Sequence, residues 1–504
     1  MESTQQVAVP GEHEGVADWA HPPMGEAFGG ASPPAGVGMD DWGLSLSSRV
    51  HAAPLPPESL EEAGLSEEFV AGLALKALYV RGAALGLDLF DMLALPMALL
   101  DEVIRQLQEH RFVEVHATRG PRRGEYVFKL TSEGRKRAIE ELEVSRYVGP
   151  APVPFEDFCL WVERQAVERA HASEQELRRA LDGIIVPDPL LELLGPAINS
   201  GRSLFLHGSP GNGKTLLAER LSRVFGQRYY VPHAVLVDGS VMIVHDPVHH
   251  RDRGGEPPTY GEADAAGASA ARYGVHDASV VSADGSCEMR REIVRSLPGH
   301  DRRYAEARRP VVVTGGELTL DQLDLQWDST GRMYHAPPQL KAAGGVLVVE
   351  DLGRQRVPVS DLLNRWVVPL EQRRDHLTLR SGKKLVVPFD CFVIFSTNLE
   401  PRSLADEAFL RRIHYKIEVP GPGRDEYEQI FRSCCEERGI EFEGEAVDYL
   451  FAEFYGQGGI EPRRCHPRDV LDHLRDLATY RGEPAGLSPG LLEPACRSVF
   501  LPVA

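Results

Sequence analysis

The sequence predicts an α/β protein built on a parallel sheet, with a helical domain after the sheet and a small α+β domain before it. Strand and helix patterns alternate over residues 155–422, which is typical of a parallel sheet whose strands are joined by helices. Residues 423–504, which follow a Pro-Gly-Pro sequence, show only helical patterns. Residues 58–148 combine helical periodicity with two alternating strands. At roughly 100–200 residues per domain, the length of 504 residues accommodates these domains.

The composition excludes several classes of protein. With 55 Lys and Arg against 75 Asp and Glu, the net charge is −20, which argues against a protein that coats nucleic acid but is compatible with one local basic patch. No stretch reaches the ~18 consecutive apolar residues of a membrane span, and the first residues lack the features of a signal peptide. Seven scattered cysteines without CxxC spacing indicate neither a disulfide framework nor a zinc site. We therefore expect a cytoplasmic protein without membrane insertion.

Several segments are predicted to be irregular. Residues 1–57 contain eight Pro and eight Gly with few large apolar residues, so we expect a disordered tail that cannot bury enough surface to offset chain entropy. Residues 149–154, with three prolines, are predicted to form a stiff linker. Residues 252–299 are rich in Gly, Ala and Asp without clear periodicity, which indicates a flexible insertion. The three histidines of residues 245–250 are interpreted as a solvated turn and not as a metal site.

Residues 58–148 resemble a winged-helix domain. Ser66 followed by two acids indicates a helix N-terminus, and a later helix shows apolar residues at i, i+3, i+4 and i+7 from Leu100. The remaining expected elements are a short helix over about 88–93, a helix beginning at Pro96, strands over 112–115 and 126–130, and a closing helix to about Tyr147 capped by Thr131 or Ser132.

The charge of this domain bears on what it binds. The turn between its two strands carries Arg119, Arg122 and Arg123, which favours DNA. Over residues 58–148, however, 16 acidic residues outnumber 12 basic ones, and phosphate binding requires local positive charge. We therefore expect the domain to dock a protein, with DNA binding as the alternative.

The segment from Gly208 to Thr215 fits the pattern GxxxxGK[ST] between a short apolar strand and a helix. In this pattern the glycines let backbone N–H groups surround phosphate oxygens at a helix N-terminus. Lys214 is expected to reach the β- and γ-phosphates of ATP, and Thr215 to supply a hydroxyl ligand for Mg²⁺. The expected nucleotide-binding residues are Gly208, Ser209, Pro210, Gly211, Asn212, Gly213, Lys214, Thr215 and Leu216.

Two later strands end in polar residues that suit the same reaction. The apolar strand 346–349 is followed by Glu350 and Asp351, and the strand 392–397 is followed by Asn398. A phosphate-binding loop needs acidic residues on a neighbouring strand to hold Mg²⁺ and activate water. We expect Glu350 to be a Mg²⁺ ligand, Asp351 to activate water and Asn398 to orient it.

With these motifs, residues 155–500 resemble an AAA+ ATPase. The resemblance implies that the loop from Gly208 is the Walker A motif, that Glu350-Asp351 is the Walker B pair and that Asn398 is sensor 1. It also implies that Arg411 or Arg412 completes the ATP pocket of a neighbouring subunit. The protein would then hydrolyse ATP as a ring, commonly a hexamer.

The resemblance extends to two further segments. Arg468 is similar to the sensor-2 arginine of a helical lid formed by residues 423–504, which implies that it faces the γ-phosphate. The hairpin pattern over 376–388 is similar to the pre-sensor-1 hairpin of MoxR-type, magnesium-chelatase-type and enhancer-binding AAA+ proteins. The most similar group is the bacterial proteins described as predicted ATPases with chaperone activity, which also have an N-terminal winged helix.

One departure from the family pattern concerns the rate of hydrolysis. The family has Asp before Glu in the Walker B pair, whereas this chain has Glu350 before Asp351, so the water-activating side chain is one methylene shorter. A misplacement of about 1 Å can cost ~10²-fold in rate, and we expect a slow ATPase. The expected function is a chaperone-like remodeller of a protein client. The alternatives are a DNA-binding regulator whose assembly ATP controls, and a nucleotide-gated scaffold with little turnover.

Overall fold

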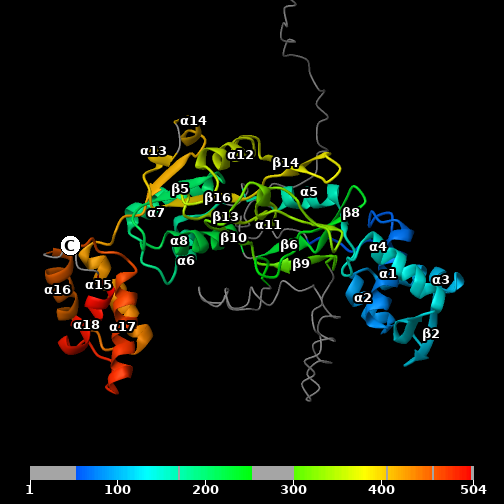
Figure 1. The fold of residues 1–504 in the computed structure, drawn as a ribbon, viewed down its shortest axis with the longest axis horizontal. Helices are drawn as coiled ribbons and strands as arrows, with labels where there is room; N and C mark the ends of the chain where they lie inside the picture. Colours follow the sequence, from blue (N-terminus) through cyan, green and yellow to red (C-terminus); the bar gives the residue numbers. More distant parts are fainter. Residues whose placement is uncertain are drawn as a thin grey trace, which may run out of the picture. The chain divides into compact units, whose positions relative to one another are not determined.

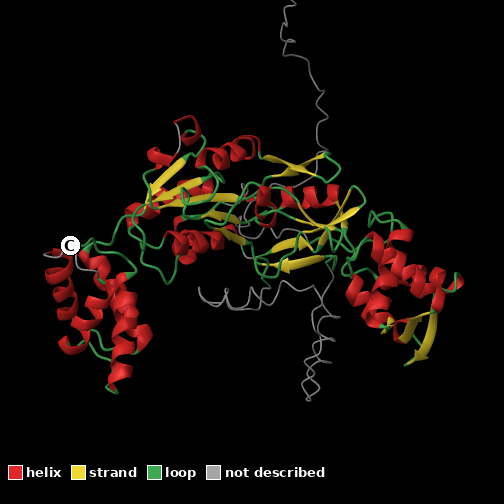
Figure 2. Ribbon diagram, in the orientation of Figure 1, coloured by secondary structure: helices red, strands yellow, loops and turns green. Residues whose placement is uncertain are grey.

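Figures 1 and 2 show the computed structural model, which describes residues 53–167, 171–226, 228–251, 300–404, 407–456 and 459–500. The predicted insertion and residues 1–52 of the predicted tail lie outside the described residues. The end of that tail departs from the prediction, because Pro54 and Pro57 are buried. The carbonyl of Pro54 also accepts a hydrogen bond from the backbone N–H of Asp301 at 2.6 Å. Packed structure is therefore already present before residue 58.

The N-terminal domain contains α1 (Glu67–Arg81), β1 (Ala83–Leu85), α2 (Gly86–Leu93), α3 (Met97–Glu109), β2 (Val113–Thr118), β3 (Tyr126–Leu130) and α4 (Ser132–Val144). The side-chain oxygens of Ser66 and Thr131 accept hydrogen bonds from backbone N–H groups at 3.2 and 3.0 Å, which confirms the predicted starts of α1 and α4. The strands form an antiparallel sheet in the order β1-β3-β2. β1 was not predicted because its sequence, Ala-Ala-Leu, is too short to show alternation.

Lys76 is a charged residue in the core of this domain. It is 5% exposed, and its Nζ donates to the carbonyl of Ser145 at 3.1 Å. Burial lowers the pKa of Lys76 from 10.5 to about 8, although the charge of Glu141 partly opposes the shift. Folding thus favours the neutral amine, so the free energy of unfolding decreases as the pH falls from 10.5 through 8.

Replacement of Lys76 by methionine, which keeps the side-chain volume and removes the charge, is expected to raise the free energy of unfolding at pH 7 by about 2 kcal/mol. The gain should shrink steadily between about pH 8 and 10.5, and urea unfolding at several pH values measures it. Lys136→Met is the matched control, since this lysine is 69% exposed and its replacement should leave the free energy of unfolding nearly unchanged. A gain that does not vary with pH would contradict the explanation.

The central domain contains the helices α5 (Phe155–Arg164), α6 (Glu174–Ala180), α7 (Asp188–Asn199), α8 (Lys214–Leu221), α11 (Pro338–Lys341), α12 (Val359–Gln372), α13 (Pro401–Leu404) and α14 (Glu407–Leu410). Its main sheet has the spatial order β10 (Val311–Thr314), β13 (Val346–Val349), β16 (Phe392–Thr397), β5 (Leu204–His207) and β17 (Tyr415–Glu418). Every neighbouring pair is parallel, so the predicted parallel sheet is confirmed.

Helices flank this sheet on both faces (Figure 1). Apolar clusters lie between the helices and each face of the sheet. Val346 and Val348 of β13 belong to a cluster with residues of α7 and α8, whereas Leu347 and Val349 belong to a cluster with residues of α12. Burial on both faces explains why the strands are continuous apolar runs rather than alternating ones. Because all the strands are parallel, their carboxyl ends meet at one edge of the sheet.

The domain also contains a second sheet and two strand pairs, of which the sequence predicted only one pair. The sheet has the order β11 (Gln326–Asp328), β12 (Met333–His335), β8 (Ser240–Ile243), β7 (Ala234–Val237) and β4 (Val153–Pro154). The antiparallel pairs are β6 (Tyr229–Pro232) with β9 (Tyr304–Ala307), and β14 (Arg374–Thr378) with β15 (Lys384–Pro388). The last pair is the predicted hairpin. The other strands are two to four residues long, and their pairings are of mixed direction, so no single period identified them.

The predicted linker is part of this second sheet. Ala151 and Val153 have no exposed surface, and β4 pairs in parallel with β7. Ala234 and Val241, from β7 and β8, belong to the same apolar cluster as the core of the N-terminal domain. Residues 149–154 are therefore packed, and the prediction of a stiff linker was wrong for these positions because burial and strand pairing hold them in place.

The C-terminal domain is helical, as predicted. It contains α15 (Arg424–Arg438), α16 (Gly444–Leu450), a π-helical turn (Phe451–Gly456), α17 (His466–Arg481) and α18 (Pro489–Val499). Its core includes Tyr427, Phe431 and Leu474, which have no exposed surface. Among the described residues, no helix is both long and apolar enough to cross a membrane.

Candidate functional site

The loop between β5 and α8 lies at the carboxyl edge of the central sheet. Gly208, Gly211 and Gly213 have φ values of 135°, 84° and 78°, a region that residues with a Cβ rarely adopt. A Cβ on Gly208 would lie 2.5 Å from the carbonyl oxygen of Val419, whereas a Cβ on Gly213 would meet no atom within 4 Å. The loop thus packs closely against the end of β17 and leaves open space at the start of α8.

The ammonium group of Lys214 bridges this loop and the end of β16. Its Nζ donates to the carbonyl oxygens of Gly208 at 2.8 Å and Ser209 at 3.0 Å, and to Oδ1 of Asn398 at 2.7 Å. Lys214 is only 7% exposed. Its three donor contacts are all to neutral oxygens, so the positive charge is solvated by the protein without being neutralised by direct contact.

Glu350 and Asp351 follow β13 directly and meet the same group of residues. Oγ1 of Thr215 donates to Oε1 of Glu350, and Nδ2 of Asn398 donates to Oδ1 of Asp351 at 3.0 Å. Asp351 has a φ of 48°, a conformation uncommon for a residue other than glycine. We call the residues that the structure brings together here the Lys214 cluster: Lys214, Thr215, Glu350, Asp351 and Asn398.

The pKa values of Glu350 and Lys214 are both shifted away from the charged forms. Burial raises the pKa of Glu350, and the charges of Asp351 and Glu219 raise it further. Burial lowers the pKa of Lys214, which Asp351 and Glu350 oppose. Each charged form would be favoured by a counter-charge close by. A divalent cation at Glu350 and a phosphate at Lys214 would supply these counter-charges.

The C-terminal domain makes contacts to the glycine loop that the sequence did not predict. The N–H of Cys465 donates to the carbonyl of Gly211 at 3.0 Å. A Cβ on Gly211 would lie 2.6 Å from Sγ of Cys465 and 3.6 Å from Cδ of Arg463. Nε of Arg463 and Oδ1 of Asn212 are buried without a hydrogen-bond partner in the described part of the chain. No spacing in the sequence relates these positions, so only the folded chain reveals their proximity.

The predicted arginines lie away from the Lys214 cluster. The side chain of Arg468 is 62% exposed and pairs with Asp469 at 3.1 Å. Nε of Arg412 pairs with Oε1 of Glu371 at 2.6 Å. The side chain of Arg411 makes no hydrogen bond or ion pair to any described residue. No contact joins these three arginines to the Lys214 cluster within the described residues.

Comparisons with known proteins give distant matches. Residues 423–498 match a family model described as a domain of unknown function (DUF8689). No curated protein sequence matches the chain significantly. The structure is similar to NtrX from Brucella abortus at 13% identity and a TM-score of 0.36, covering 63% of this chain and 57% of that one. A structure of NtrX from Brucella abortus in complex with ADP gives 14% identity and a TM-score of 0.36, and the match covers 74% of this chain and 68% of that one.

A RuvB mutant from Thermotoga maritima gives 13% identity, a TM-score of 0.34 and coverage of 63% of this chain and 72% of that one. These structural similarities are distant, with TM-scores below 0.4. This chain spans less than two thirds of the length of the first NtrX structure.

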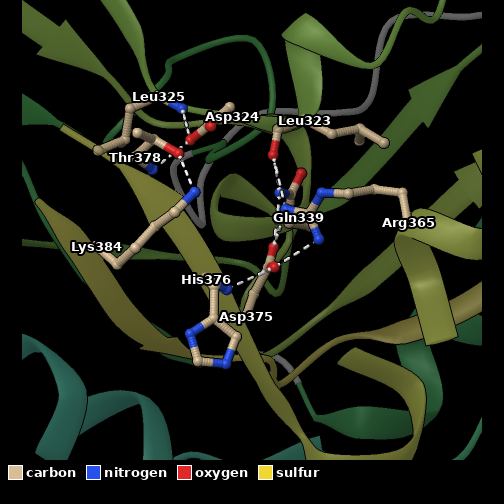
Figure 3. Close-up of polar contacts among 9 residues, drawn as sticks. All are labelled: Leu323, Asp324, Leu325, Gln339, Arg365, Asp375, His376, Thr378 and Lys384. Atoms are coloured by element: carbon tan, nitrogen blue, oxygen red, sulfur yellow. Dashed lines mark hydrogen bonds and ion pairs between the residues drawn. The ribbon is translucent and has the colours of Figure 1, made fainter. Parts of the chain in front are cut away.

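Figure 3 shows a buried polar network that joins α11, α12 and the β14–β15 hairpin. Arg365 donates to both carboxylate oxygens of Asp375, at 2.6 and 2.9 Å. Nε2 of Gln339 and the N–H of His376 donate to the same carboxylate at 3.0 and 2.7 Å. Asp375 is 1% exposed. Because α11 precedes β13 and α12 follows it in the chain, the network fixes the hairpin to the elements on either side of Glu350.

Residues 247–249 form a turn with exposed residues, as expected, but His250 is not solvated. His250 is 2% exposed, its Nδ1 accepts from the N–H of Asp246 at 2.9 Å and its Nε2 donates to the carbonyl of Lys341 at 2.9 Å. Burial lowers the pKa of His250 to about 3, so the ring is neutral and structural. Over the described residues, no group of His, Cys, Asp and Glu is arranged to hold a metal ion.

Proposed function

We propose that this chain binds ATP together with Mg²⁺ at the Lys214 cluster and hydrolyses it. The observation that carries the proposal is the position of the Lys214 ammonium, which contacts the loop carbonyls of Gly208 and Ser209 and the side chain of Asn398. A cation at the mouth of a glycine loop, with a helix N-terminus behind it, is the arrangement that binds phosphate oxygens.

The oxygen donors at this cluster suit Mg²⁺. The hydroxyl of Thr215 and the carboxylate of Glu350 are in contact, and hard oxygen ligands are those that Mg²⁺ prefers. When bound, Mg²⁺ would neutralise charge on the β- and γ-phosphate oxygens. Thr215 and Glu350 would hold the ion, and Lys214 would exchange its loop carbonyls for phosphate oxygens.

Asp351 and Asn398 are the proposed residues for the attacking water. The carboxylate of Asp351 would accept a proton from water, and Asn398, which already donates to Asp351, would orient the same water. Aspartate has a shorter reach than glutamate at this position, so the near-attack geometry is harder to achieve. The proposed reaction is therefore slow.

A direct test uses the full-length protein, calorimetric titration with ATP and an assay of released phosphate. With Mg²⁺ we expect binding in the ~1 μM–1 mM range and turnover below the ~1–10³ s⁻¹ usual for enzymes. Excess EDTA should weaken binding by about tenfold or more, because Glu350 would then face the phosphates without a cation between them. Absence of binding at about 1 mM ATP, with a native circular dichroism spectrum, would contradict the proposal.

We further propose that copies of the chain act as a ring that remodels a protein client, and that a neighbour's Arg411 completes each ATP site. The absence of any side-chain partner for Arg411 among the described residues supports this role. In the N-terminal domain, Arg105 pairs with Glu102 and Arg123 pairs with Asp101. These pairs offset part of the positive charge of the domain, and acidic residues outnumber basic ones over residues 58–148, which supports a protein client over the DNA-binding alternative.

A further inference from the structure

A pocket of about 460 Å³ opens at the amino edge of the central sheet. We call it the arginine pocket; its polar lining is Arg202, Glu371, Arg373, Arg411, Arg412 and His414. The sequence drew attention only to Arg411 and Arg412, because the other residues come from separate segments of the chain.

The position of the arginine pocket separates it from the Lys214 cluster. Arg202 precedes β5 and His414 precedes β17. Arg373 donates to the carbonyls of Gly201 at 3.0 Å and Cys391 at 3.4 Å, which precede β5 and β16. Since these strands are parallel, their amino ends lie at the opposite edge of the sheet from the glycine loop. The arginine pocket is thus a second polar site on the same domain.

The charges of the arginine pocket are not balanced. Four guanidinium groups line it with a single carboxylate, and that carboxylate, Glu371, pairs with Arg412 at 2.6 Å. Oδ1 of Asp390 lies 3.8 Å from Nη2 of Arg373 and partly compensates the charge of this guanidinium. Nη1 of Arg202 donates to Nε2 of His414, which is not an anion. Two of the four guanidinium groups, those of Arg202 and Arg411, therefore have no acidic partner among the described residues.

His414 supports the same conclusion. A guanidinium can only donate a hydrogen bond, so Nε2 of His414 must accept and the ring is neutral. Burial lowers the pKa of His414, and the positive charge of Arg202 lowers it further. The arginine pocket thus contains unpaired positive charge and holds the imidazole of His414 neutral. A bound anion would offset the unpaired guanidinium charges and would raise the pKa of His414 again.

We propose that the arginine pocket binds a phosphate group, held mainly by Arg202 and Arg411. Guanidinium forks match the geometry of phosphate oxygens and donate two parallel hydrogen bonds. The phosphate can come from a free phosphorylated small molecule or from the nucleotide bound to a second copy of the chain. Only the second source rests on the proposed function, because the first needs no ATP at the Lys214 cluster.

The first experiment tests a free phosphate compound on the full-length Lys214→Ala chain, which weakens phosphate binding at the glycine loop. Pyrophosphate is titrated into dilute protein by calorimetry. We expect binding that the further exchanges Arg202→Gln and Arg411→Gln weaken by about tenfold or more. Arg402→Gln is the matched control, since Arg402 lies in an adjoining pocket that Arg411 also lines. Circular dichroism verifies that each variant is folded.

The second experiment tests the nucleotide of a second copy. The Lys214→Ala chain, with an intact arginine pocket, is mixed with an Arg202→Gln/Arg411→Gln chain, with an intact Lys214 cluster. If the pocket receives the phosphates of a neighbour, the mixture should hydrolyse ATP about tenfold faster than either chain alone. Activity in the mixture with no pyrophosphate binding assigns the second source, and pyrophosphate binding with no activity assigns the first.

The proposal is overturned if the arginine exchanges do not alter pyrophosphate binding and the mixture shows no gain in activity. Its failure is separable from that of the proposed function. ATP binding by the unmodified chain, together with both negative results, would remove the arginine pocket and the proposed role of a neighbour's Arg411, and would leave ATP binding at the Lys214 cluster in place. Failure of the unmodified chain to bind ATP would remove the proposed function and leave the pyrophosphate experiment decisive for the pocket.

Discussion

Lys214→Ala is expected to lower the rate of ATP hydrolysis by about 10²–10³-fold, because removal of one preorganised donor to a developing charge typically has that effect. Lys214 is 7% exposed, and its ammonium is directed by contacts to Gly208, Ser209 and Asn398, so water cannot substitute for it. Alanine also leaves Oδ1 of Asn398 without its 2.7 Å partner. Release of phosphate under saturating ATP and Mg²⁺ measures the rate.

Stability provides an independent readout for this variant. Burial lowers the pKa of Lys214, so the ammonium is unfavourable in the folded protein at neutral pH and its loss should not unfold the chain. Lys136→Ala serves as the matched control, since Lys136 is exposed and pairs only with Glu133 among the described residues. Hydrolysis by Lys214→Ala at the unmodified rate would show that the Lys214 cluster is not the site of reaction.

Replacement of Trp366, in α12, is expected to have a large effect on the free energy of unfolding. This residue is 2% exposed, and its ring packs edge-on against Phe389 and Phe395 with centroid distances of 5.6 and 6.2 Å. Trp366→Ala should lower the free energy of unfolding by about 3–5 kcal/mol, the usual effect of a large cavity in a core. Because Phe395 belongs to β16, which ends beside Asn398, nucleotide binding should weaken in parallel.

Trp366→Phe separates the effect of volume from that of polarity. Nε1 of Trp366 is buried without a hydrogen-bond partner in the described part of the chain, so phenylalanine removes an unfavourable group while keeping most of the packing. We expect a loss below about 2 kcal/mol for this variant. Urea unfolding followed by circular dichroism compares the two, and equal losses would contradict the importance of the cavity.

The sequence predicted the parts of the candidate site that depend on short-range pattern. The glycine loop, the apolar strand before Glu350 and the strand before Asn398 each have a local signal, because a strand buried on both faces is a continuous apolar run. Parallel strands bring their carboxyl ends together, so the proximity of Lys214, Glu350 and Asn398 followed from the fold class. The starts of α1 and α4 were predictable for the same reason, since a cap is a local hydrogen bond.

Other features had no such signal. The second sheet is built from short strands drawn from distant segments, and residues 149–154 carried the composition of a linker although Ala151 and Val153 are fully buried. Likewise, a cluster of histidines beside a glycine-rich stretch gave no indication that His250 would be 2% exposed. Burial depends on what the rest of the chain covers, and composition alone does not contain that information.

By itself, the sequence determined the parallel α/β core, the helical C-terminal domain and the five residues of the Lys214 cluster. The tertiary structure alone decided that Cys465 and Arg463 approach Gly211 while Arg468 is exposed and paired with Asp469. It also decided that Arg202, Arg373 and His414 meet Arg411 in one pocket. The physical reason is that strand and helix periods act over a few residues, whereas these contacts join segments whose meeting depends on how every intervening element packs.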